Sequence, residues 1–295
     1  MQDYQEIPGN SETKVLYNVP DLECGTIKNV VLRQGITEEL WNRVIEICEP
    51  PQQSDHIKDL SNEVTPEQEP TESSCESNDI DDESDEEEVH IEAPGHRHRV
   101  CVVGSNGIGK TTTTAVLIRS LLLRGKSVVY HIRTADKSRW VYEFIPNMND
   151  VEHNTAHNIE VKVIPEYKFN VALTPTIVDN IQNYYIVDPD TTFDGNCNPD
   201  NQVQCRVILI TSPDERQWGG KNFTMLRGGK TSGTFVYYPS WTLTELLPSY
   251  SLMIPATDNV LTHDTVMERF NEVGGIPGYI LAPSHSYLDI VAAQS

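Results

Sequence analysis

The sequence predicts an α/β protein whose main sheet is parallel. From Arg99 onward, short apolar strands alternate with helical segments, which is typical of strands joined by crossover helices. Tyr184–Asp188 and Arg206–Thr211 are almost continuously apolar, as strands covered on both faces are. The length of 295 residues allows one large or two small domains with a substantial core.

The first 49 residues divide into two parts. Residues 1–28 form a polar segment with little pattern, in which the short apolar group Val15–Tyr17 is compatible with a strand or with no regular structure. Residues 29–49 predict a strand at Val30–Leu32 and a helix that begins at Thr37 and carries an apolar face up to Cys48. We expect this strand and helix to form an arm that packs on the domain that follows.

Residues 50–93 are predicted to be a disordered acidic insertion. Between Glu49 and Ala93 the chain has 17 acidic residues and one basic residue, Lys58, and these account for −16 of the formal net charge of −22. The segment is rich in Ser, Gln and Pro and almost lacks large apolar side chains, so it cannot supply a core.

Residues 94–295 are predicted to form one α/β domain. We expect five parallel strands with helices on both sides of the sheet, and an inserted β-hairpin around a polar tip at 147–158. Thr242 and Glu245 form a capping box that begins one of the last two expected helices. In chain order, the expected strands are Arg99–Gly104, Ser127–Arg133, Tyr184–Asp188, Arg206–Thr211 and Thr234–Tyr238, the hairpin strands are Arg139–Ile145 and Ile159–Ile164, and the helices are Lys110–Arg124, Pro175–Gln182, Thr242–Leu247 and His263–Val273.

The strongest motif follows the first of these strands. The residues Gly104, Ser105, Asn106, Gly107, Ile108, Gly109, Lys110 and Thr111 match the pattern G-x-x-x-x-G-K-[ST] without a substitution. Glycine allows the backbone to wrap a phosphate closely, the lysine neutralises the β- and γ-phosphate oxygens, and the Thr111 hydroxyl is placed to bind Mg²⁺. The start of the following helix, including Thr112, adds N–H groups and a favourable dipole. We call Gly104–Thr111 the phosphate loop.

A phosphate loop requires a second metal ligand, usually an acid at the end of a neighbouring strand. Asp188 ends the apolar strand Tyr184–Asp188 and is the predicted ligand, although an Asp before Pro189 is also common in simple turns. Asp190 is a candidate for orienting the attacking water. Thr211 or Ser212, at the end of the next strand, is a candidate for contact with the γ-phosphate or the water.

Composition argues against several classes of protein. The chain has no basic block that would neutralise the phosphates of a nucleic acid, so direct nucleic-acid binding is not expected. The six cysteines show no metal-binding spacing and are expected to be reduced thiols. No signal peptide or long apolar run is present, so neither secretion nor a membrane span is expected, and the sequence favours a cytoplasmic or nuclear protein.

Several short motifs appear together in an order that resembles one family. After the phosphate loop come YIVD at 185–188, ILITSPD at 208–214, YYPSWTLTEL at 237–246 and RFNEVGGIPGYIL at 269–281. This order, over roughly Val30–Ala282, is similar to the P-loop ATPase domain of Crinkler-type effectors and retrotransposon hot spot proteins. The resemblance implies phosphate binding by Gly104–Thr111 and metal binding by Asp188.

The resemblance also implies landmarks further along the chain, and it has gaps. Trp241 and Glu245 mark the segment after the fifth strand, and Gly274–Pro277 match the family's closing signature. The Arg that usually follows this signature is Gly278 here, so its contact with the nucleotide is lost or made by another residue such as Arg269. Family membership would suggest secretion to a host cell nucleus, whereas no leader motif opens this chain and no nuclease or kinase domain is expected after Ala282.

These patterns predict a P-loop NTPase of the additional-strand class that binds ATP and Mg²⁺. ATP is favoured over GTP because no Asn-Lys-x-Asp motif follows the Asp188 strand. We expect slow hydrolysis that drives a switch or an assembly, with a protein partner or self-association. Two alternatives remain open, namely a nucleotide-binding interaction module without hydrolysis, and a small-molecule kinase whose lid would be Arg216–Lys230.

Overall fold

The computed structural model describes residues 5–7, 10–20, 27–33, 35–49, 99–133, 139–146, 159–165, 175–188, 203–213, 234–253 and 261–294. The chain divides into two compact units, of which Met1–Pro50 with Arg97–Ser295 is one and Pro51–His96 is the other. All described residues belong to the first unit. The predicted insertion at 50–93, the hairpin tip and the possible kinase lid lie outside the described residues.

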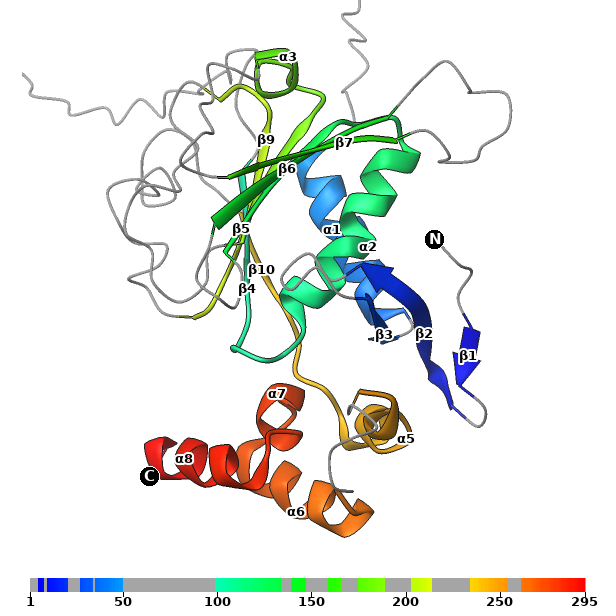
Figure 1. Cartoon of the computed structure of the whole chain (residues 1–295), viewed down its shortest axis with the longest axis vertical. Helices are drawn as coiled ribbons and strands as arrows, with labels where there is room; N and C mark the ends of the chain where they lie inside the picture. Colours follow the sequence, from blue (N-terminus) through cyan, green and yellow to red (C-terminus); the bar gives the residue numbers. More distant parts are fainter. Residues whose placement is uncertain are drawn as a thin grey trace, which may run out of the picture. The chain divides into compact units, whose positions relative to one another are not determined.

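The main feature of the fold is a mixed seven-stranded sheet (Figure 1). Its strand order is β10-β4-β9-β8-β5-β6-β7. The first five strands in this order are parallel, and β6 and β7 continue the sheet as an antiparallel hairpin. The five parallel strands and the hairpin insertion are therefore confirmed. The strands are β4 (Arg99–Val103), β5 (Val128–Arg133), β6 (Arg139–Pro146), β7 (Ile159–Pro165), β8 (Tyr184–Asp188), β9 (Arg206–Thr211) and β10 (Thr234–Tyr237).

Side chains alternate between two apolar layers along the parallel strands, because successive strand residues point to opposite faces. In β4, Val100 and Val102 belong to the larger core cluster, whereas Cys101 and Val103 belong to the smaller one. Two helices, α1 (Ile36–Cys48) and α2 (Lys110–Leu123), cover the larger face (Figure 1). The short helix α3 (Pro175–Val178) supplies Ile177 and Val178 to the smaller cluster. Helices thus lie on both faces.

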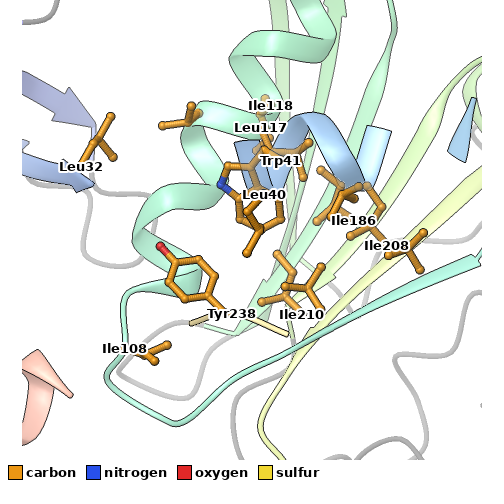
Figure 2. Close-up of a cluster of buried hydrophobic side chains, with 14 of the residues drawn as sticks. Leu32, Leu40, Trp41, Ile108, Leu117, Ile118, Ile186, Ile208, Ile210 and Tyr238 are labelled. Atoms are coloured by element: carbon orange, nitrogen blue, oxygen red, sulfur yellow. The ribbon is translucent and has the colours of Figure 1, made fainter. Parts of the chain in front are cut away.

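The N-terminal arm is attached to the larger core cluster. Strands β1 (Gln5–Ile7), β2 (Asn10–Pro20) and β3 (Ile27–Arg33) form a separate antiparallel sheet, and α1 follows β3. From α1, Trp41, Val44 and Ile45 are almost completely buried. Figure 2 shows Trp41 and Leu40 in the same cluster as Ile186 and Ile208 of the sheet. The arm therefore completes the core of the sheet on this face.

Four helices follow β10. They are α5 (Leu243–Met253), α6 (His263–Val273), α7 (Pro277–Ile280) and α8 (Ser284–Gln294), and they lie together beyond the end of β4 and β10 (Figure 1). The predicted capping box is confirmed, because the Thr242 N–H donates to Glu245 Oε2 at 2.7 Å and the Glu245 N–H donates to Thr242 Oγ1 at 3.3 Å.

Several sequence predictions differ from the structure. Two helices were expected after β10, but α7 and α8 are also present. Helix α5 was expected to end at Leu247, before Pro248, yet it continues to Met253. Beyond the proline, the buried Ser249 hydroxyl donates to the Glu245 carbonyl at 2.7 Å. The N-terminal polar segment, for which no clear structure was expected, contains β1 and β2, and the predicted helix at 175–182 has only four residues.

Two further observations concern composition. Cys48, Cys101 and Cys205 are free, and burial raises the pKa of each thiol to about 12, so these described cysteines are protonated at neutral pH. Among the helices that the structure describes, none combines the length and apolar character of a membrane span.

Candidate functional site

The phosphate loop connects β4 to α2 at the carboxyl edge of the parallel strands. Val103 ends β4 and Lys110 is the first residue of α2. The loop is anchored to the neighbouring strand, since the Gly104 N–H donates to the Thr211 carbonyl at 3.1 Å. Ile108 is 1% exposed and belongs to the larger core cluster, at the end of the cluster that Figure 2 shows beside the loop. One apolar side chain thus holds the loop against the core.

The backbone of the loop takes a shape that only some residues tolerate. Gly107 and Gly109 have φ values of 76° and 103°, in the left-handed region where a side chain is strained. No side chain caps the start of α2. The N–H groups of Gly109, Lys110 and Thr111 have no backbone acceptor within the part of the chain that the structure describes. The loop therefore presents unused donors at a helix N-terminus, which is the arrangement that binds phosphate.

Lys110 is buried inside this loop, with 8% of its surface exposed. Its ammonium donates to the Gly104 carbonyl at 2.6 Å and to the Ser105 carbonyl at 2.9 Å. Burial lowers the pKa of Lys110 to about 8, and the negative charge of Asp188 acts in the opposite direction. A phosphate group next to the ammonium would compensate for the lost solvation, so the environment of Lys110 suits an anionic ligand.

The two predicted residues from neighbouring strands lie at the same edge as the loop. Asp188 ends β8 and is 7% exposed, and the Tyr130 hydroxyl of β5 donates to its Oδ2 at 3.3 Å. Thr211 ends β9, pairs with Val103 in register and is buried. Lys110, Asp188 and Thr211 are thus brought to one edge by three adjacent strands in the order β4-β9-β8.

Thr111 and Thr112 occupy the first turn of α2 and are partly exposed. Among the described residues, no three or more His, Cys, Asp or Glu side chains are grouped so that they could hold a metal ion. A Mg²⁺ site built from one threonine hydroxyl and one carboxylate, completed by water and phosphate oxygens, does not need such a group. Metal binding by Thr111 and Asp188 therefore stays a prediction.

The segment after β10 contacts the outer side of the loop. The Trp241 indole N–H donates to the Ile108 carbonyl at 3.2 Å, and the Gly278 N–H donates to the Gly107 carbonyl at 2.8 Å. Tyr238 lies next to the helix start, with its hydroxyl 3.2 Å from Thr113 Oγ1. Its burial raises the pKa of that phenol, so Tyr238 is neutral.

Two further residues were suggested for the site, Arg269 and Asp190. Arg269 was suggested as a replacement for the family's nucleotide-binding Arg, but its guanidinium donates to the Ile280 and Ala282 carbonyls at 2.8 and 2.6 Å and lies 4.2 Å from the ring centroid of Tyr287. These contacts join α6 to α7 and α8, so the suggestion is wrong for this structure. Asp190, the candidate for orienting water, lies outside the described residues.

Sequence reasoning missed three contributors to the site. Tyr130 was recognised only as a strand residue, and Tyr238 only as the end of a strand. Trp241 was recognised as a motif residue without a role. Each makes a hydrogen bond to a residue between 58 and 133 positions away in the chain. Whether its side chain points toward that residue depends on the fold. The one available signal was the position of Trp241 within the YYPSWTLTEL segment.

Comparison with known proteins does not add to this picture. Neither the models of protein families nor the curated protein sequences give a match to this chain.

Proposed function

We propose that this chain binds ATP with Mg²⁺ at the phosphate loop and hydrolyses it slowly as a P-loop NTPase of the additional-strand class. The observation that carries the proposal is the combination of a buried lysine and unused N–H donors in a loop that precedes a helix. Such a loop favours a polyphosphate over a single carboxylate, because a polyphosphate has enough oxygen atoms to accept from several N–H donors and from one ammonium.

The order of the strands supports the class. In the additional-strand class, one strand separates the strand before the phosphate loop from the strand that bears the metal-binding acid. Here β9 lies between β4 and β8. In this proposal Thr111 and Asp188 bind Mg²⁺, Lys110 neutralises the β- and γ-phosphates, and Thr211 faces the γ-phosphate or the attacking water. Mg²⁺ supplies charge neutralisation on the phosphate oxygens.

The contacts on the outer side of the loop fit a switch. A ligand that binds only one arrangement of the loop also favours the arrangement of every segment packed on it. Trp241 and Gly278 contact the loop directly, so we propose that nucleotide binding changes how firmly residues 238–253 and 261–281 are held. A protein partner, or a second copy of the chain, would respond to that change.

The experiment that tests the proposal is calorimetric titration of the full chain with ATP in the presence of Mg²⁺. Wild type is expected to bind, and Lys110→Ala is expected to bind at least tenfold more weakly, which corresponds to about 1.4 kcal/mol. Lys126→Ala is a matched control, because Lys126 donates to Gln182 and approaches Glu49 away from the loop. Equal affinity in wild type and Lys110→Ala would exclude the phosphate loop as the site.

Turnover measurements separate the alternatives. Asp188→Ala is expected to weaken Mg²⁺-dependent binding, whereas Asp190→Ala is expected to bind Mg·ATP and turn it over about 10²-fold more slowly. Tight binding by wild type without turnover would favour the interaction module instead. Faster turnover on addition of a phosphoryl acceptor would favour the kinase.

A further inference from the structure

We propose that Trp241 is a positioning residue of the phosphate loop, which orients one N–H donor for phosphate through the carbonyl of Ile108. This inference rests on the proposed nucleotide-binding function and extends it to a residue that would not touch the ligand. Trp241 is 6% exposed, and its indole N–H donates to the Ile108 carbonyl at 3.2 Å.

The geometry of the peptide unit links the Ile108 carbonyl to the Gly109 N–H. In a trans peptide the C=O and the following N–H point in opposite directions. The Ile108 carbonyl and the Gly109 N–H belong to one such unit. Because the carbonyl is held toward Trp241, the Gly109 N–H points away from Trp241. That N–H has no backbone acceptor among the described residues and stands at the N-cap of α2, where a phosphate would be bound.

Gly109 would otherwise have considerable freedom. It lies in the left-handed region, with φ of 103°, and no heavy atom comes within 4 Å of the position that a Cβ would take. The peptide unit after Gly109 is held, because the Gly109 carbonyl accepts from the Thr113 N–H at 3.0 Å. The unit before it can rotate at little steric cost, because glycine has no side chain to clash. The hydrogen bond from Trp241 therefore supplies a restraint that packing around Gly109 does not.

The indole itself is firmly held. The backbone N–H of Trp241 donates to the Gly275 carbonyl at 2.9 Å, and Glu245 accepts hydrogen bonds from the backbone N–H and the hydroxyl of Thr242 at 2.7 and 2.8 Å. A buried guanidinium, that of Arg33, then joins this segment to β3. It donates to Glu245 at 2.8 and 3.0 Å and lies 5.4 Å from the ring centroid of Trp241.

Arg33 also fixes the residues that lead to Trp241. Its remaining donors reach the Pro239 carbonyl at 2.6 Å and the Ser240 carbonyl at 2.9 Å. A planar guanidinium that makes several hydrogen bonds at fixed angles restrains its partners more than a flexible ammonium would. The N-terminal arm thus places the indole, and the indole places the peptide between Ile108 and Gly109.

The experiment compares two conservative substitutions of buried tryptophans. Trp241→Phe removes the donor to Ile108 and keeps an aromatic ring. Trp41→Phe is the matched control, because Trp41 is 1% exposed and its indole nitrogen has no hydrogen-bond partner in the described part of the chain. Both changes remove one buried indole N–H, but only the first removes a hydrogen bond to the loop.

Two quantities are measured on the full chain, well below its melting temperature. The first is amide hydrogen exchange of residues 104–109 without nucleotide, and the second is affinity for Mg·ATP by calorimetry. Trp241→Phe is expected to accelerate exchange in the loop and to weaken ATP binding about five- to tenfold, the scale of one hydrogen bond. Trp41→Phe is expected to leave both quantities at their wild-type values.

Unchanged loop exchange in Trp241→Phe would overturn the inference, whatever happens to the affinity. An equal effect of Trp41→Phe on the loop would overturn it as well, since the effect would then follow from general loosening of the core. Failure of the wild-type chain to bind ATP would refute the proposed function and leave the exchange measurement as an independent test of the role of Trp241.

Discussion

Replacement of Gly278 by alanine tests how closely the C-terminal segment must approach the phosphate loop. A Cβ on residue 278 would lie 2.6 Å from the Cα and 2.9 Å from the carbonyl oxygen of Gly107. Both are backbone atoms, so the contact is not relieved by rotation of a side chain. The two segments would have to separate by about 0.8 Å to reach ordinary contact at 3.4 Å.

That separation has an energetic consequence that can be estimated. The hydrogen bond from the Gly278 N–H to the Gly107 carbonyl would lengthen from 2.8 Å to about 3.6 Å, which is beyond hydrogen-bonding range. Loss of the bond costs about 1 kcal/mol, and the residual strain of a crowded contact costs about 1–3 kcal/mol. Alanine is better than glycine in helix α7 by at most about 1 kcal/mol, so a net loss of about 1–4 kcal/mol is expected.

The assay is thermal unfolding together with titration of Mg·ATP, for wild type, Gly278→Ala and the control Gly274→Ala. Gly274 has φ of 73° and no neighbour within 4 Å of a Cβ, so alanine there strains the backbone without touching the loop. Both variants should melt earlier, but only Gly278→Ala should lose nucleotide affinity. Wild-type affinity and melting temperature in Gly278→Ala would refute the argument.

Two further predictions concern side chains that support the site. Tyr130→Phe removes the hydroxyl that donates to Asp188. The affinity for ATP measured with Mg²⁺ should therefore fall several-fold, while the affinity measured without Mg²⁺ stays the same. An equal fall of both affinities would mean that Tyr130 does not act through Asp188. Burial by itself would raise the pKa of Glu245, but hydrogen bonds from Arg33 and Thr242 outweigh it and hold this pKa below the usual 4.5. The ion pair therefore stabilises the fold above about pH 4.5, and this contribution is lost as the pH falls through the lower pKa of Glu245 in the folded state. Between pH 6 and pH 3 the melting temperature of wild type should fall more steeply than that of Glu245→Gln. Parallel curves for the two proteins would contradict this.

The sequence predicted the parallel part of the fold well, because its evidence is local. The strands β8 and β9 and the helix α6 have the predicted bounds, since each shows either a continuous apolar run or a helical period ended by a glycine. Helix α8 was missed, and of strand β2 only Val15–Tyr17 was considered as a possible strand. Their sequences, NSETKVLYNVP and SHSYLDIVAAQ, are mixed in polarity and have weak local signals.

The candidate site also contains residues that the sequence could predict and residues that it could not. The phosphate loop, Asp188 and Thr211 could be found from sequence, because each is the end of a recognisable strand or a motif of fixed spacing. The residues that hold the loop from outside could not be found, because Arg33 and Glu245 are 212 positions apart and Trp241 and Ile108 are 133 apart. Such contacts depend on how the N-terminal arm and the C-terminal helices pack, which no local pattern records.

The chain leaves and re-enters the described fold at neighbouring points on either side of segment 50–98. At its start the Cys48 carbonyl accepts from Arg206 at 2.7 Å, and at its end Arg99 pairs with Val207, so both ends meet beside the beginning of β9. This is the amino end of the parallel strands, opposite the phosphate loop. A single cut in the peptide backbone here would separate residues 1–49 from the rest as an independent polypeptide. That polypeptide carries Arg33 and the buried face of α1, so the two fragments should reassociate, and the fold around the phosphate loop would then depend on complementation between them.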